Sequence, residues 1–171
     1  QHQLRIDPTN LYHAESPYEL VRKMRASFYM LGALLGRMRQ AKVSLPGGCA
    51  WGPRPVDLHL EGLKAFGADI KLEQGNIIAT TGKNGLTGGR FTMKPSSVGA
   101  TVNLLLAAVK AAPGAVCEIH NAAREPDVVL LCRMLEKMGA QIEGIASRQL
   151  RITGVETLEP VQFTNASDRI E

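Results

Sequence analysis

"LKAFGADIKLEQGNIIAT", residues 63–80, contains the pattern that decides the fold, because most of it occurs again elsewhere in the chain. Its first eight residues return as "LEKMGAQI" at 135–142, displaced by 72 positions. Its last five, "NIIAT", return as "QLRIT" at 149–153, and "QLRID" at 3–7 is a third version. Segments that recur at one spacing are typical of an internal structural repeat. The sequence therefore predicts a repeating unit of about 73 residues.

Each unit is predicted to be β-α-β-α-β-β, with helices covering a sheet, so the fold class is α/β. "SPYE" at 16–19 has the form of a capping box with Pro at the first helical position, and it predicts a helix that runs to Met38. The residues expected on the apolar face of this helix are Leu20, Met24, Phe28, Leu31 and Leu35. The other elements expected are a strand at 42–45, a helix at 55–66, strands at 69–72 and 76–80, a strand at 90–93, a helix at 98–111, a strand at 115–119, a helix at 126–138, and strands at 141–145 and 149–153.

The repeat divides the chain into segments. Residues 1–15 are predicted to hold the last strand of an incomplete unit, and 16–88 and 89–160 two complete units. Repeated units of this kind bury their apolar faces against neighbouring units.

Composition narrows the class of protein. The 171 residues are 44% apolar and 21% charged, which is ordinary for a globular domain. No apolar run approaches the roughly 20 residues that cross a membrane, and no signal peptide is evident. Three widely spaced cysteines argue against a disulfide framework and favour a reducing cytoplasm. Without Cys-x-x-Cys or His-x-x-x-His pairs, the sequence predicts neither a metal site nor a bound cofactor.

The net charge of +4 favours a small anionic ligand over nucleic acid. A nucleic-acid interface needs a dense basic stripe with aromatic stacking residues. Here Phe, Trp and Tyr together number 4 + 1 + 3 = 8, and basic residues are dispersed apart from the cluster Arg22, Lys23 and Arg25. A merely solvated basic surface is the alternative.

Sequence features that both units share are expected to belong to the scaffold, and features found in one unit only are candidates for the functional site. "PGGCAWGPRPVDLH" at 46–59 has "IHNAAREPDVVL" at 119–130 as its counterpart, which lacks the glycines and the cysteine. Cys117 and Cys132 lie in apolar runs and are expected in the core. Cys49 instead lies in a loop between a strand and a helix, where functional residues commonly occur. A buried Cys49 is the alternative.

Two helix starts, one beside this loop and one in the second unit, predict anion binding, because the free N–H groups and the dipole of a helix start attract negative charge. Pro55 at the first helical position places Arg54 beside the cap, where its guanidinium matches a phosphate or carboxylate. In "KPSSVGAT" at 94–101, either Ser96 or Ser97 is expected to cap the next helix, and Gly99 permits close approach. Plain capping there, and a helix-dipole role for Asp57, are the alternatives.

"LPGGCAWGPRPVDLHLEGLKAFGA", "MRAS", "SVGAT" and "NAAREP" resemble the UDP-N-acetylglucosamine 1-carboxyvinyltransferases, and the resemblance extends from about Leu4 to Glu171. These enolpyruvyl transferases act in peptidoglycan precursor synthesis, and they have two similar domains of three β-α-β-α-β-β units each, an inside-out α/β barrel. The resemblance implies that this chain forms most of one domain. Residues 161–171 would then begin the crossing to a second domain, which supplies further contacts, as does an N-terminal Lys-Asn motif of the family.

The resemblance also implies residue roles. Cys49 would be the general acid that protonates the methylene carbon of phosphoenolpyruvate, which suits a thiol that is mostly protonated at neutral pH. UDP-N-acetylglucosamine would be bound by Arg25, Arg54, Pro55, Val56, Asp57, Leu58, Ser97 and Val98. Ser96, Gly99 and Glu125 are further candidates, and a structural ion pair is the alternative for Glu125.

One departure concerns phosphate binding. Pro95-Ser96 stands where many members of the family have Lys-Val, so a lysine contact to phosphate is in doubt, although Lys94 is adjacent. Two other functions stay open: the related 3-phosphoshikimate 1-carboxyvinyltransferase activity, whose enzymes lack the cysteine loop, and a non-catalytic domain that binds a nucleotide sugar.

Overall fold

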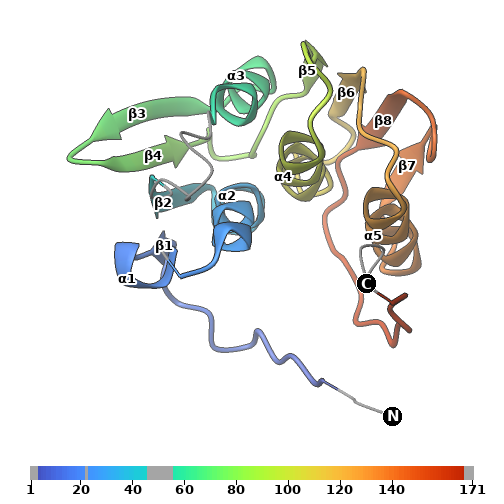
Figure 1. Cartoon of the computed structure of the whole chain (residues 1–171), viewed down its shortest axis with the longest axis horizontal. Coiled ribbons are helices and arrows are strands. Elements are labelled where there is room, and N and C mark those ends of the chain that lie inside the picture. The colour runs from blue at the N-terminus through green and yellow to red at the C-terminus, as the bar shows by residue number, and fades with distance from the viewer. Residues whose placement is uncertain (1–3, 22, 46–55, 168–171) are drawn as a thin grey trace.

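The computed structural model describes residues 4–21, 23–45 and 56–167, and of Leu20 and Arg25 the backbone only. Two four-stranded sheets with their helices follow one another along the chain (Figure 1). The first contains β1 (Glu15–Ser16), α1 (Tyr18–Val21), the 3₁₀ helix η1 (Arg25–Tyr29), α2 (Met30–Met38), β2 (Gln40–Ser44), α3 (Asp57–Ala65), β3 (Asp69–Glu73) and β4 (Asn76–Thr80). The second contains β5 (Gly89–Thr92), α4 (Val98–Ala108), β6 (Val116–His120), α5 (Pro126–Lys137), β7 (Gln141–Glu143) and β8 (Gln149–Thr153).

The two sheets have the same topology, which confirms the predicted repeat. Their strand orders are β1-β2-β4-β3 and β5-β6-β8-β7. In each, the first pair is parallel and the other two pairs are antiparallel. β2 pairs with β4 from Gln40–Thr80 to Ser44–Asn76, and β6 pairs with β8 from Val116–Thr153 to His120–Gln149. Each unit is therefore β-α-β-α-β-β, as the α/β class requires.

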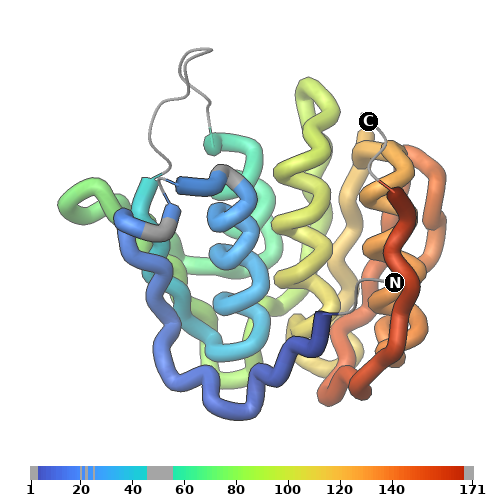
Figure 2. Tube along the Cα trace, turned by 60° about the horizontal axis from the view of Figure 1, so that its bottom comes forward, coloured from blue at the N-terminus to red at the C-terminus, as the bar shows by residue number. Residues whose placement is uncertain are grey.

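Helix α4 forms the centre of the molecule. It packs against α2, α3 and α5, and the helices run side by side in Figure 2. Its sequence is apolar on nearly every side, as expected for a helix enclosed by others. Close approach of α2 depends on Gly32, because a Cβ there would lie 2.0 Å from the Asn103 carbonyl oxygen. The two units are thus joined through one buried helix, and their apolar residues form one core cluster.

The prediction of one continuous helix from residue 16 to Met38 is wrong. The chain instead forms α1, η1 and α2, because Met24 has extended backbone angles (φ −148°, ψ 118°). Phe28, Leu31 and Leu35 are buried as predicted, but Met24 is 60% exposed. The periodic spacing of these apolar residues hid the interruption, since α1 and α2 pack onto the same core.

The strand expected at residues 3–7 is not formed in its described part. Residues 4–14 contain neither helix nor strand. The equivalent strands β4 and β8 each lie between two antiparallel neighbours of their own unit, and residues 4–7 pair with no strand of the described chain. Within the described ranges, no helix has the length and apolar character needed to cross a membrane.

Candidate functional site

The candidate residues fall into two groups. Cys49, Arg54 and Pro55 lie outside the described residues, and Arg25 contributes the first backbone position of η1. The remaining candidates lie at the beginnings of three helices: Val56, Asp57 and Leu58 at α3, Ser96, Ser97, Val98 and Gly99 at α4, and Glu125 at α5. These helices pack on one another through α4, so the structure gathers the described candidates on neighbouring elements.

The start of α4 is held by a capped and cross-linked first turn. Ser97 is the N-cap, and its hydroxyl oxygen accepts a hydrogen bond from the Ala100 N–H at 3.3 Å. The Thr101 hydroxyl donates to the Ser97 carbonyl at 2.8 Å and accepts from the Ala123 N–H at 3.0 Å. The sequence left the choice of capping residue open between Ser96 and Ser97, and the structure assigns the cap to Ser97. The positive end of the α4 dipole is fixed relative to the loop after β6.

The start of α3 is built differently. Its N-cap is Val56, whose side chain has no oxygen with which to cap the first turn and belongs to the core. Leu58 packs partly buried against that core, while Asp57 is exposed in the first turn, where its charge complements the helix dipole. Any contact from Val56 to a ligand must therefore come from its backbone. Asp57 is free to contact a ligand with its side chain.

Two buried polar residues that the sequence analysis did not single out connect α3 to α4. His59 is 4% exposed and Asn103 is fully buried, and the Asn103 amide nitrogen lies 3.0 Å from His59 Nδ1. The edge of the His59 ring lies against Gly99 in the first turn of α4. The sequence offered one signal, since His59 directly continues the Arg-Pro-Val-Asp-Leu run.

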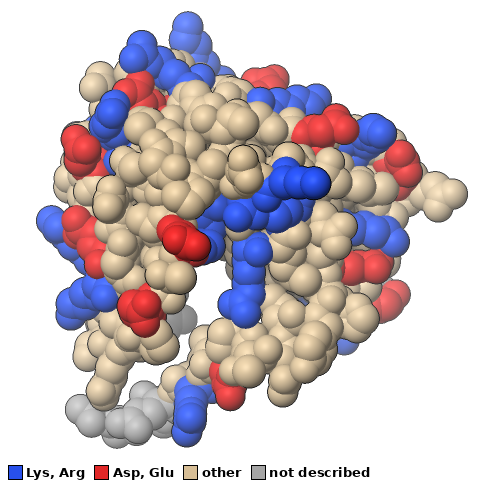
Figure 3. All heavy atoms as spheres, turned by 180° about the vertical axis from the view of Figure 1, so that it is seen from behind, with Lys and Arg blue, Asp and Glu red and all other residues tan. Residues whose placement is uncertain are grey.

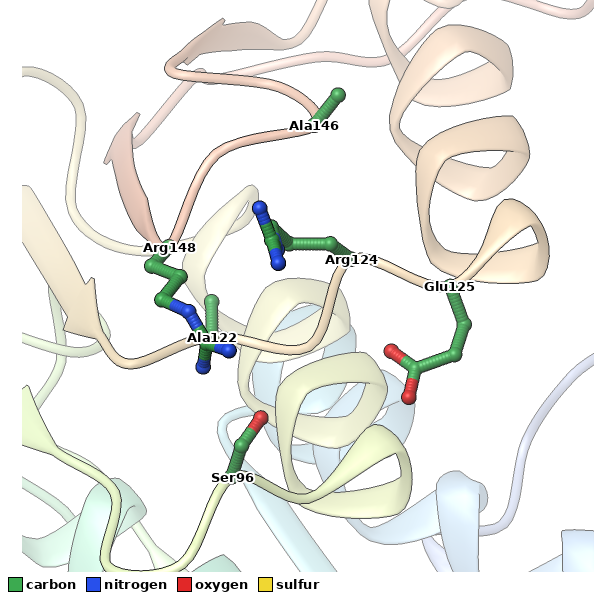
Figure 4. A pocket seen from close by; sticks show the side chains of 6 residues that line it. All are labelled: Ser96, Ala122, Arg124, Glu125, Ala146 and Arg148. Carbon is green, nitrogen blue, oxygen red and sulfur yellow. The ribbon is translucent and has the colours of Figure 1, made fainter.

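A cavity of about 510 Å³ opens between the starts of α4 and α5 (Figure 4). The side chains of Arg124 and Arg148 extend into this space from two different loops, and Ser96 faces it from the α4 side. The side-chain oxygen of Asn121 accepts a hydrogen bond from Arg148 Nη1 at 2.7 Å, and this bond helps to position the Arg148 guanidinium. Glu125 also lines the cavity. Ser96 and Glu125 thus share one space, with two cations that the sequence analysis missed.

Arg124 could have been identified from the sequence by comparing the helix starts of the two units. Arg124 and Glu125 precede α5, which begins at Pro126. In the first unit, Arg54 likewise stands shortly before the start of α3 in the sequence. Because the two units share one topology, Arg124 occupies the corresponding loop of the second unit. Arg148 comes from the turn between β7 and β8, and no pattern in the sequence marked it.

Cys117 and Cys132 are core residues, as predicted. Cys117 is fully buried in β6, and burial raises the pKa of its thiol to about 12. Burial raises the pKa of the Cys132 thiol to about 11, with a smaller contribution from the Glu136 carboxylate. Both thiols therefore stay protonated and poorly reactive at neutral pH.

Charged groups elsewhere form surface ion pairs. Glu118 accepts from Arg90 Nε at 2.7 Å and from Arg151 Nη1 at 2.9 Å, and the Arg90 hydrogen bond lowers the pKa of that carboxyl. On the face shown in Figure 3, Lys and Arg are interspersed with Asp and Glu. Among the described residues, no three His, Cys, Asp or Glu side chains come together in a way that could hold a metal ion.

Similarity to known proteins agrees with this architecture. The family model described as EPSP synthase (3-phosphoshikimate 1-carboxyvinyltransferase) matches residues 1–171. The chain is 58% identical over 170 residues to the UDP-N-acetylglucosamine 1-carboxyvinyltransferase of Chloroherpeton thalassium and 52% identical over 163 residues to that of Sphingopyxis alaskensis. It covers 39% and 38% of the lengths of those two proteins, while 99% and 95% of the chain is matched.

Solved structures give the same fold. The enolpyruvyl transferase NikO from Streptomyces tendae matches 86% of the chain with a TM-score of 0.69 at 25% identity, and 34% of that protein is covered. An EPSP synthase from Acinetobacter baumannii matches 80% of the chain with a TM-score of 0.59, and 30% of it is covered. With its repeated β-α-β-α-β-β units and a family model that matches every residue, the chain belongs to the EPSP synthase (3-phosphoshikimate 1-carboxyvinyltransferase) family.

Proposed function

We propose that this chain is part of an enzyme that transfers the enolpyruvyl group of phosphoenolpyruvate to the 3-hydroxyl of UDP-N-acetylglucosamine and releases phosphate. The observation that carries the proposal is the 58% identity, over 99% of the chain, to a protein named UDP-N-acetylglucosamine 1-carboxyvinyltransferase. The matched region extends across the cysteine loop, because it covers 99% of the chain. Because the chain spans 39% of that protein's length, the activity is proposed for the whole protein.

The chemistry proposed for Cys49 is general acid catalysis. Its thiol gives a proton to the methylene carbon of phosphoenolpyruvate, and the 3-hydroxyl oxygen of the sugar, which releases its own proton to solvent, forms a bond to the adjacent carbon. The new methyl group then returns a proton to the Cys49 thiolate while the bond from that carbon to the phosphate oxygen breaks, which gives the enolpyruvyl ether and free phosphate. A covalent adduct of Cys49 with phosphoenolpyruvate is a second outcome of the same protonation. Cys117 and Cys132 cannot take this role, because both are buried in the core.

The nucleotide sugar is proposed to bind across the starts of α3 and α4. Arg54 and Arg25 supply cations, Asp57 and the backbone of Pro55, Val56 and Leu58 contact the uridine, and Ser97 and Val98 contact the diphosphate. This proposal is supported by the fixed first turn of α4, whose dipole favours a diphosphate. Ser97 Oγ already accepts from Ala100, so its hydroxyl hydrogen remains available as a donor to phosphate.

Three wider features belong to the same proposal. The reaction would be the first committed step of peptidoglycan precursor synthesis in the cytoplasm, needed for cell wall formation, cell shape and division. An epoxide phosphonate such as fosfomycin would alkylate Cys49. A second domain of the same protein would close over the substrates.

The competing acceptor is shikimate 3-phosphate, because the matching family model is named after that enzyme. The test is phosphate release by the full-length protein with phosphoenolpyruvate and either acceptor. We expect turnover with UDP-N-acetylglucosamine and none with shikimate 3-phosphate. The opposite preference would overturn the proposal, and tight binding of UDP-N-acetylglucosamine with no turnover would favour a non-catalytic sugar-nucleotide domain.

A further inference from the structure

Arg124 and Arg148 carry positive charges that no carboxylate of the described chain neutralises. Residues 89–160 contain five arginines. Three of them form ion pairs with glutamate carboxylates, and these three are Arg90, Arg133 and Arg151. Arg148 has a neutral partner instead, the side-chain oxygen of Asn121. The Arg124 guanidinium has neither a hydrogen bond nor an ion pair within the described ranges.

The fold brings these two charges into one cavity. Both side chains extend into the space of about 510 Å³ between the starts of α4 and α5 (Figure 4). The two loops that carry them are joined, because the Ala122 N–H donates to the Arg148 carbonyl at 3.0 Å. Asn121, which holds the Arg148 guanidinium, is itself held by a hydrogen bond from its amide nitrogen to the Met93 carbonyl at 3.0 Å. Two like charges repel in a shared cavity, and an anion between them replaces repulsion with attraction.

The other polar groups of the cavity indicate which anion fits. A guanidinium presents a planar fork of donors that matches phosphate oxygens, and Ser96 adds a hydroxyl on the α4 side. Glu125 lines the cavity beside α5, where its carboxylate repels a second anion but can accept hydrogen bonds from hydroxyl groups. A ligand that carries both phosphate and hydroxyl groups, as a phosphorylated sugar does, matches these groups better than a free anion.

We propose that Arg124 and Arg148 bind the diphosphate of UDP-N-acetylglucosamine from the α5 side, opposite the contacts of Ser97 and Val98. The proposal rests on the proposed function, which places the diphosphate at the first turn of α4. Ser96 faces the cavity and directly precedes Ser97, the cap of that turn, so the cavity opens beside the proposed diphosphate position. The two arginines thereby supply the positive charge that the backbone donors of the turn do not carry.

Binding of UDP and of uridine to the full-length protein, measured by isothermal titration calorimetry, tests this role. Arg124→Gln and Arg148→Gln should each weaken UDP binding about tenfold, the usual loss for one hydrogen bond to a charged group. Uridine lacks the phosphates and should bind as before, whereas general damage to the fold would weaken both ligands. The control Arg133→Gln removes an arginine of α5 that pairs with Glu136 outside the cavity, and it should change neither affinity. Unchanged UDP affinity in both cavity variants would overturn the proposal.

Inorganic phosphate as a second probe distinguishes a nucleotide phosphate from a free one. If the two cavity variants weaken phosphate binding but leave UDP binding intact, the cavity takes free phosphate and the proposal is wrong. In the turnover assay, both variants should raise KM for UDP-N-acetylglucosamine and leave KM for phosphoenolpyruvate unchanged. Normal KM values in both variants would refute the role of the arginines while the proposed function stands. If the unsubstituted protein binds UDP through these arginines but transfers no enolpyruvyl group, the proposed function fails and the phosphate site stands.

Discussion

Two of the three cysteines, Cys117 and Cys132, are buried in the core. Burial makes a thiol poorly reactive, so the location of each cysteine determines whether its thiol can react. Burial raises the pKa of Cys117 to about 12 and that of Cys132 to about 11, so neither forms much thiolate near neutral pH. Cys49 comes from the glycine-rich stretch that is present in one repeat and missing from the other. A thiol in such a loop is expected to meet solvent and ligands.

Fosfomycin and iodoacetamide should therefore modify Cys49 at least ten times faster than Cys117 or Cys132 in the folded chain, because the reactive thiolate forms readily only at an accessible site. Peptide mass mapping after timed quenching measures the three rates. A denatured sample, in which all three thiols are exposed, is the control. Equal rates in the folded chain would mean that Cys49 is buried like the other two.

The closest approach of α2 to α4 occurs at Gly32, which has no side chain. In Gly32→Ala, the new Cβ would lie 2.0 Å from the Asn103 carbonyl oxygen and 2.5 Å from its side-chain oxygen, so the helices must separate. We expect the free energy of unfolding to fall by about 3 kcal/mol, the upper end of the usual cost of overpacking. Urea unfolding followed by circular dichroism measures the change.

Gly82→Ala is the matched control, because a Cβ at Gly82 meets no atom within 4 Å and its backbone needs no positive φ. This variant should stay within about 0.5 kcal/mol of the original chain. Equal effects of the two substitutions would contradict the close packing of α2 and α4.

At the scale of secondary structure, the sequence predicted the last strand of each unit best. β4 and β8 have the predicted bounds, because each pairs with its neighbours in the register that their alternating apolar residues favour. The division of the first helix could not be predicted, since the apolar spacing from Leu20 to Leu35 fits one helix as well as three. Arg148 and Asn103 reach the site region through tertiary contacts between distant segments, which sequence spacing does not reveal.

The cap of α4 is a local feature with a measurable contribution. Ser97→Ala removes the acceptor for the Ala100 N–H and should lower the free energy of unfolding by about 1 kcal/mol. Ser96→Ala changes the neighbouring serine, which is exposed at the cavity, and should alter stability by less than about 0.5 kcal/mol. Thermal and urea unfolding of both variants compare the two serines. A larger loss for Ser96→Ala would show that the cap is assigned to the wrong residue.

At the scale of the whole molecule, the chain spans 39% of the length of the Chloroherpeton thalassium relative, and this limits the activity expected of the chain by itself. Catalysis of enolpyruvyl transfer requires two substrates held in register and protected from water. The proposed site uses the starts of α3 and α4, and the proposed second domain supplies further charges. Removal of one positioned charge commonly costs several kcal/mol in the transition state.

The 171-residue chain by itself should therefore release no phosphate from phosphoenolpyruvate and UDP-N-acetylglucosamine above the rate of its Cys49→Ala variant. A sensitive phosphate assay on a preparation free of full-length enzyme makes this comparison. Turnover of the chain alone would show that the groups assigned to a second domain are dispensable.

The most direct measurement follows the carbon atoms of phosphoenolpyruvate in the full-length protein. With ¹³C-labelled phosphoenolpyruvate and UDP-N-acetylglucosamine, NMR should show the label in an enolpyruvyl ether at the 3-oxygen of the sugar, with one phosphate released per transfer. The Cys49→Ala protein should form none of this product while still binding the nucleotide sugar. Label in the ether formed equally well without Cys49, or label transferred only to shikimate 3-phosphate, would contradict the proposed reaction.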